Sequence, residues 1–175
     1  MKLKQQVVYA LLTAILAGVV TYVTEAMSGA PVANCAGNGL TYISFCTWAC
    51  YFVCGLSIKG AANWLYSMVV GEICAILMFV LTVAFLPSMG FLVGVSVAVI
   101  IIVFFMMFYD KLIINGAALF IGTGLFFSVA AAGGCPNFAM GEYMQIAIAE
   151  IIYTVIGLAA GWVTIWFAGL ASKIK

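Results

Sequence analysis

The chain has 175 residues, of which 67% are hydrophobic and only 6% are charged, and it contains no histidine. So little polar surface does not cover a soluble globule of this size, and the composition therefore predicts a membrane protein. A net charge of +1 without a basic cluster argues against nucleic-acid binding. The sequence has no phosphate-binding glycine loop, nucleophile motif or metal-ligand spacing, so we expect neither an enzyme nor a cofactor or metal.

Apolar stretches follow one another along the chain, each close to the ~20 residues with which a helix crosses a bilayer. The six predicted spans are Gln6–Thr24, Leu40–Ile58, Ala61–Leu86, Gly90–Tyr109, Leu112–Ala132 and Tyr143–Ala168. Pro87 and Gly90 separate the third span from the fourth, which would otherwise form one long helix. We therefore expect an all-α, polytopic membrane protein with a single membrane domain over residues 1–175.

The positive charges fall in the segments that lie on one side of this topology. All of them are lysines, at positions Lys2, Lys4, Lys59, Lys111, Lys173 and Lys175. Because cytoplasmic segments carry an excess of Lys and Arg, this pattern predicts that both termini are in the cytoplasm.

A weak internal repeat relates the two halves of the chain. Residues 46–53 align with residues 122–129, and residues 71–73 align with residues 149–151. Halves of three spans each, residues 1–87 and 88–175, would have opposite orientations in the membrane, as in many transporters and channels. Chance similarity between apolar segments is the alternative interpretation.

Two carboxylates lie deep within predicted spans. Glu25, Asp110 and Glu142 are near span ends, whereas Glu72 and Glu150 are not. An ionisable group at such depth is costly in lipid and is expected to face protein or water. We interpret the pair as lining a solute path near the midplane, and the alternative is that each carboxylate braces irregular backbone. With no Arg or His in the chain, we expect at least one of the two to be protonated or solvated by water.

Hydroxyl and aromatic side chains of the second and fifth spans complete this predicted path. Thr47 and Thr123 would offer hydroxyl groups to the solute. Aromatic rings would set the bore, and core packing is the alternative role of these rings. The aromatic residues are Trp48, Tyr51, Phe126 and Phe127.

The cysteines suggest one covalent link. Cys35 and Cys135 fall in segments on the outer side, where an oxidising compartment would allow a disulfide between them. Cys46, Cys50 and Cys54 recur on one helix face, and we interpret them as packing residues rather than metal ligands.

Short motifs of the chain resemble a known family. Residues 51–54 (Tyr-Phe-Val-Cys), the Lys59-Gly60 pair and residues 120–123 (Phe-Ile-Gly-Thr) are similar to those of the domain-of-unknown-function family 1097, a group of small bacterial inner-membrane proteins. The resemblance implies a multi-pass protein of the bacterial inner (plasma) membrane and brings no established activity with it. A longer outer segment at residues 34–38 departs from the family. The general design also resembles that of six-span urea and amide channels.

These observations lead to a function hypothesis with open alternatives. We expect a membrane channel for a small polar or gaseous solute such as urea, an amide, ammonia or carbon dioxide. A proton- or cation-coupled transporter of a small solute is the first alternative, and a non-conducting structural subunit is the second. The expected partners are the lipid bilayer, the small-molecule solute and further copies of the chain in a homo-oligomer.

Overall fold

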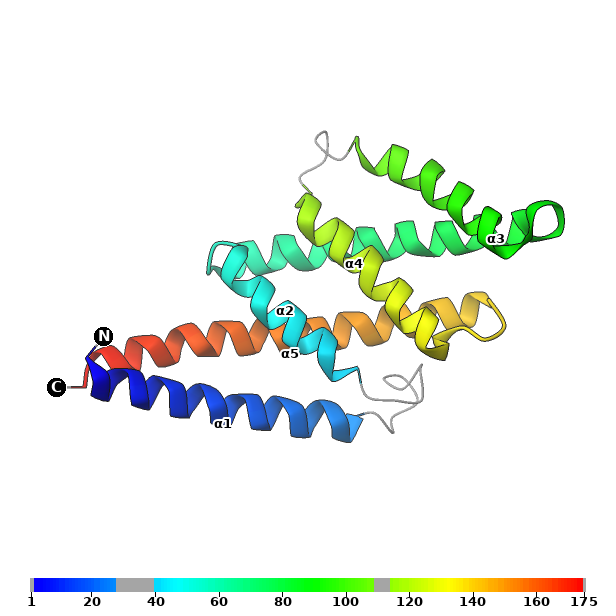
Figure 1. The fold of residues 1–175 in the computed structure, drawn as a ribbon. Coiled ribbons are helices and arrows are strands. Elements are labelled where there is room, and N and C mark those ends of the chain that lie inside the picture. Colours follow the sequence, from blue (N-terminus) through cyan, green and yellow to red (C-terminus); the bar gives the residue numbers. More distant parts are fainter. Residues whose placement is uncertain (1, 28–39, 109–113, 175) are drawn as a thin grey trace.

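The fold is entirely helical in the part of the chain that the computed structural model describes, which is residues 2–27, 40–108 and 114–174. Figure 1 shows the arrangement of the helices. The elements are α1 (Leu3–Met27), α2 (Thr41–Val53), α3 (Ile58–Met106), α4 (Gly116–Val129), the short π-helix η2 (Ala130–Gly134) and α5 (Met140–Ser172).

The helices are those of a membrane protein. Within the described ranges, four of them are long and apolar enough to cross a bilayer: α1, α3, α4 together with η2, and α5. Their outward faces carry large apolar side chains such as Leu11, Ile100 and Trp166. Such surfaces are stable in lipid and would be unfavourable in water.

Helix α3 is broken at Gly90. The backbone there has φ 71° and ψ 172°, a conformation that only glycine adopts readily, and Pro87 lies three residues earlier. The chain reverses at this point, so that residues 58–89 and 91–106 form two arms that lie side by side (Figure 1). The predicted break between the third and fourth spans is thereby confirmed.

Helix α2 is shorter than the sequence predicts. It ends at Val53 rather than at Ile58 because Gly55 and Leu56 both have positive φ, 90° and 53°, which stops the helix. The hydroxyl of Ser57 then accepts a hydrogen bond from the Gly60 amide at 3.0 Å and caps α3. With 13 residues, α2 is about 20 Å long, less than the ~30 Å of a hydrocarbon core.

The helices α4 and α5 are each fixed at their start by a side chain. The Asn115 side chain accepts a hydrogen bond from the Ala118 amide at 3.2 Å and caps α4. The Glu142 carboxylate accepts hydrogen bonds from the amides of Asn137 and Ala139, both at 3.1 Å, and holds the first turn of α5.

The two short helices cross the two long ones. Helix α2 packs across α5, α4 packs across the first arm of α3, and α1 lies along α5 (Figure 1). Both crossings depend on glycine: a Cβ atom on Gly157 of α5 would collide with Thr47, and one on Gly71 of α3 would collide with the Leu119 carbonyl. Small residues let helices approach closely enough for van der Waals contact in a membrane.

The long helices also contact each other, and this contact positions the site. The first arm of α3 and α5 meet in the interior of the molecule, where two buried clusters lie along them. One cluster includes Phe79, Phe126 and Tyr143. The other includes Tyr51, Trp64 and Leu158.

Candidate functional site

The two deep carboxylates meet between α3 and α5. Glu72 is 2% exposed and Glu150 is 0% exposed, and the two carboxyl groups are within hydrogen-bonding reach of each other. They come from positions far apart in the sequence. The sequence predicts that both lie deep and sheltered from lipid, and the structure adds that they form one site.

The Glu150 carboxyl has no other partner. Among the described residues, no hydroxyl, amide or backbone N–H group donates a hydrogen bond to either of its oxygens. Two ionised carboxylates at hydrogen-bonding distance would repel each other strongly in a medium of low dielectric constant. A proton shared between the two carboxyls would relieve this repulsion.

Among the described residues, no lysine is buried with the pair. The lysines Lys2, Lys4, Lys59 and Lys173 lie at or next to helix ends. The chain contains neither Arg nor His.

Thr47 and Thr123 hold the crossing helices close to the pair. The Thr123 hydroxyl donates to the carbonyl of Gly71, next to Glu72, at 2.9 Å. The Thr47 hydroxyl contacts the Ile43 carbonyl at 2.9 Å and lies 3.4 Å from the Thr154 carbonyl, one turn beyond Glu150. In this conformation both hydroxyls join helices, and their role in lining a path stays a prediction.

The aromatic side chains of α2 contact α5. The Trp48 indole Nε1 donates to the Thr164 hydroxyl at 3.0 Å. Tyr51 is 1% exposed and packs over Gly161, where a Cβ atom would collide with its ring. These contacts fix α2 on α5.

The aromatic side chains of α4 belong to the cluster beside the pair. Phe126 is fully buried, with its ring centroid 6.0 Å from that of Phe79, and Phe127 lies 4.6 Å from the same ring. Both rings thus pack α4 against Phe79 of the first arm of α3.

The structure adds three site residues that the sequence analysis did not single out. Trp64, Tyr143 and Thr154 each bury a polar side-chain atom that has no hydrogen-bond partner within the described part of the chain. Their helical spacing from Glu72 and Glu150 is the sequence signal that points to them, since it places them on the same helix faces as the carboxylates.

The predicted disulfide involves one residue outside the described part of the chain, Cys35. Its proposed partner Cys135 is buried, 4% exposed, and belongs to the cluster that contains Tyr143. The disulfide between them stays a prediction.

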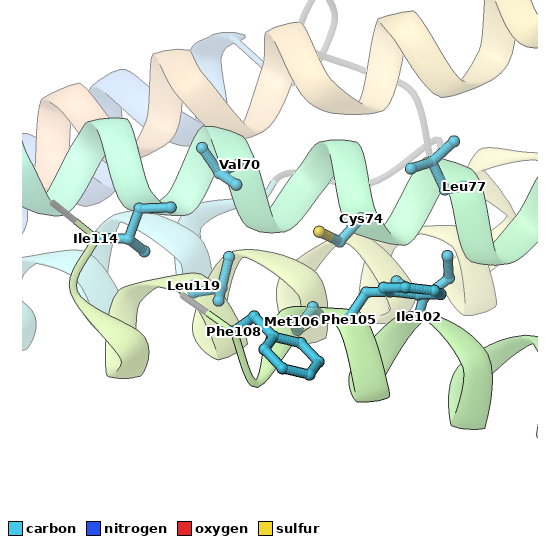
Figure 2. Close-up of a pocket in the computed structure, with 9 residues that line it drawn as sticks. All are labelled: Val70, Cys74, Leu77, Ile102, Phe105, Met106, Phe108, Ile114 and Leu119. Carbon is cyan, nitrogen blue, oxygen red and sulfur yellow. The ribbon is translucent and has the colours of Figure 1, made fainter. Parts of the chain in front are cut away.

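An apolar cleft of about 340 Å³ (Figure 2) includes neither carboxylate among its lining residues. It is formed by both arms of α3, the start of α4 and the segment that precedes it. Its lining consists of Val70, Cys74, Leu77, Ile102, Phe105, Met106, Phe108, Ile114 and Leu119. These side chains carry no oxygen or nitrogen, so the cleft suits an apolar chain and offers a polar solute no hydrogen bond.

The fold and the site define a class: an all-helical membrane protein with a carboxyl pair buried between two long, antiparallel helices. The chain belongs to the family described as a protein of unknown function (DUF1097), which matches residues 10–169. The resemblance found in the short motifs is thus confirmed. No curated protein and no solved structure matches the chain.

Proposed function

We propose that this protein is a proton-linked transporter of a small polar solute in the bacterial inner membrane, with Glu72 and Glu150 as its proton site. The observation that carries the proposal is the sealed pair of facing carboxyls without a basic partner. A pair that is stable only with a shared proton changes its charge when it opens to water or binds a solute. Proton release and solute binding are then coupled at one place.

The sealed geometry favours a transporter over the channel hypothesis. A channel that conducts in this conformation needs water beside its lining groups, and the two carboxyl groups are 2% and 0% exposed. A transporter exposes its site to each side in turn and passes through closed states. Sealed carboxyls are expected in such a state.

The arrangement of the helices supports six spans in two inverted halves. In Figure 1, a half-turn about the viewing direction brings α1 onto residues 91–106 of α3, α2 onto α4, and residues 58–89 of α3 onto α5. Helices related in this way run in opposite directions. The same relation is expected if the halves 1–87 and 88–175 have opposite orientations in the membrane. Such halves are a common basis for alternating access. The lysine pattern supports cytoplasmic termini.

The solute that this site suits carries N–H groups. Ionised carboxylates accept hydrogen bonds and do not donate them, and no lysine of the described segments is buried beside them to bind an anion. Ammonium, amines and small amides therefore fit the pair, and carboxylate or phosphate solutes do not.

The test is uptake into proteoliposomes that contain the purified full-length protein. A solute panel of methylammonium, urea, acetamide and glycerol is offered under an imposed proton gradient and without it. We expect a solute with N–H groups to accumulate above its equilibrium level, and the accumulation to collapse when a protonophore is added. Glu72→Gln and Glu150→Gln each remove a titrating group while keeping the size of the side chain, so both variants lose the accumulation.

The matched control is Glu25→Gln, because Glu25 is an acidic residue near the end of α1 and accepts a hydrogen bond from Thr41 at 2.6 Å. This variant should accumulate the solute like the wild type. If the solute equilibrates across the membrane without accumulating, the result would support the channel hypothesis instead. If no solute crosses the membrane and the Glu variants change only the assembly of the protein, the result would support the hypothesis of a structural subunit.

A further inference from the structure

The interior of the molecule contains buried polar side-chain atoms without hydrogen-bond partners. In the described segments these atoms are Trp64 Nε1, Tyr143 Oη, Thr154 Oγ1 and both carboxyl oxygens of Glu150, which has only the Glu72 carboxyl beside it. The four residues are between 0% and 2% exposed. Roughly 90% or more of buried polar groups in proteins are paired, so each unpaired group calls for an explanation.

These atoms lie on one face of each long helix. On α5, Tyr143, Glu150 and Thr154 are separated by seven and four positions, a spacing that keeps them on the same face. On the first arm of α3, Trp64 and Glu72 are separated by eight positions and also share a face. We call the line of these five residues the α3–α5 seam.

The seam extends on both sides of the carboxyl pair. The first arm of α3 and α5 run in opposite directions (Figure 1). Trp64 therefore lies about 12 Å from Glu72 towards one end, and Tyr143 lies about 10 Å from Glu150 towards the other, at 1.5 Å per residue.

Packing contacts agree with this order. The Tyr143 ring lies 5.9 Å from the ring of Phe79, which follows Glu72 on α3. Trp64 belongs to the same buried cluster as Leu158, which follows Thr154 on α5. The unpartnered atoms thus form a row through the protein with the carboxyl pair in its middle.

The hydrogen-bond donors and acceptors in this row indicate which kind of ligand would fit it. The indole N–H of Trp64 can only donate, so it requires an acceptor from the ligand. A carboxylate at Glu150 requires an N–H or O–H donor, and the hydroxyls of Tyr143 and Thr154 serve either role. A small amide offers a carbonyl acceptor and N–H donors together, whereas an ammonium ion offers no acceptor.

We infer that the α3–α5 seam is the solute path of this protein and that its solute is a small neutral amide. Trp64, Thr154 and Tyr143 bind the amide in turn on either side of the Glu72–Glu150 pair. In the closed conformation these groups lack partners, and in a conformation in which the seam opens the amide and water supply them. The inference deepens the proposed function and depends on it.

Two pairs of matched variants test the seam. Tyr143→Phe removes an unpartnered hydroxyl, and Tyr153→Phe removes the hydroxyl of a buried tyrosine on the same helix that donates to the Thr24 carbonyl at 3.1 Å. Thr154→Val is matched by Thr164→Val, whose hydroxyl accepts from Trp48 at 3.0 Å. Uptake of urea and acetamide per folded protein is measured together with the melting temperature in detergent.

We expect Tyr143→Phe and Thr154→Val to reduce amide uptake about two- to tenfold, which is the effect of one lost hydrogen bond to the solute. Their melting temperatures should equal or exceed that of the wild type, because the atom removed has no partner in the closed protein. The control variants should show the reverse: a lower melting temperature and unchanged uptake.

The outcomes separate the seam from the proposed function. If the Glu variants abolish accumulation while Tyr143→Phe and Thr154→Val transport amides like the wild type, the seam is wrong and the proton site stands. If the wild type accumulates methylammonium and no amide, the amide assignment is wrong. If the Glu variants accumulate solute normally, the proposed function itself fails.

Discussion

At the scale of single residues, burial separates the polar groups of this protein into two kinds. Ser44, Thr123 and Trp48 each donate a hydrogen bond to another helix and stabilise a contact. Glu150 and Tyr143 are equally buried but lack such partners in the described structure, apart from the contact between Glu150 and Glu72. Hydropathy does not distinguish the two kinds, so only the tertiary structure shows which polar groups join helices and which lack a hydrogen-bond partner.

The hydrogen bond of Ser44 gives a prediction about bracing. Its hydroxyl donates to the Tyr153 carbonyl at 2.8 Å and joins α2 to α5. Ser44→Ala should lower the free energy of unfolding by about 0.5–1.5 kcal/mol, measured by unfolding in mixed detergent and dodecyl sulfate. Ser96→Ala is the control, since its exposed hydroxyl bonds only to Leu92 of its own helix, at 2.8 Å. Equal stability of the two variants would contradict a bracing role.

At the scale of elements, the two short helices determine how the long helices meet. Helix α2 lies on α5 and α4 lies on the first arm of α3, each through a close contact at glycine. These contacts place Thr123 beside Gly71, and so next to Glu72, and Thr47 near Thr154, one turn from Glu150. The carboxyl pair therefore lies between two crossings of similar construction, and the proposed transport cycle would require one crossing to move relative to the other.

The crossing of α2 and α5 gives a prediction about packing. Gly157→Ala places a methyl group against Thr47 and the Ser44 carbonyl. Overpacking of this kind costs about 1–3 kcal/mol, so the free energy of unfolding should fall by that amount.

The matched control for this variant is Gly124→Ala. A Cβ atom at Gly124 meets no other atom within 4 Å, although the residue is also within a helix. Alanine there should leave stability unchanged or raise it by up to about 1 kcal/mol, because glycine is the poorer helix former. If Gly157→Ala were as stable as Gly124→Ala, the crossing would not depend on close approach.

At the scale of the whole molecule, the chain brings its two ends together. The Gln5 side chain donates to the Ile174 carbonyl at 2.9 Å and to the Ser172 carbonyl at 3.3 Å, so α1 begins where α5 ends. The junction of α2 and α3 lies towards the same side in Figure 1. Lysines are found at these three places, as the proposed topology requires. The outward apolar faces are left for lipid or for another copy of the chain.

Reporter fusions test this topology. A reporter that is active only in the cytoplasm should be active at the C-terminus and after Ser57, while one that is active only outside should be active after Phe138. The lysines are expected to hold their segments inside. Activity of the outer reporter at the C-terminus would overturn the proposed orientation.

The sequence by itself determined the helical membrane class, the expectation that Glu72 and Glu150 are sheltered from lipid and the break at Gly90, because these follow from local hydropathy and from backbone preferences. It misplaced the end of α2, since an apolar run continues through the turn at Gly55 and Leu56. Only the tertiary structure decided that the two carboxyls meet and that Trp64, Tyr143 and Thr154 line up with them. Apolar helices resemble one another in composition, so the faces that come together are chosen by close packing at residues such as Gly71 and Gly157, which no local pattern encodes.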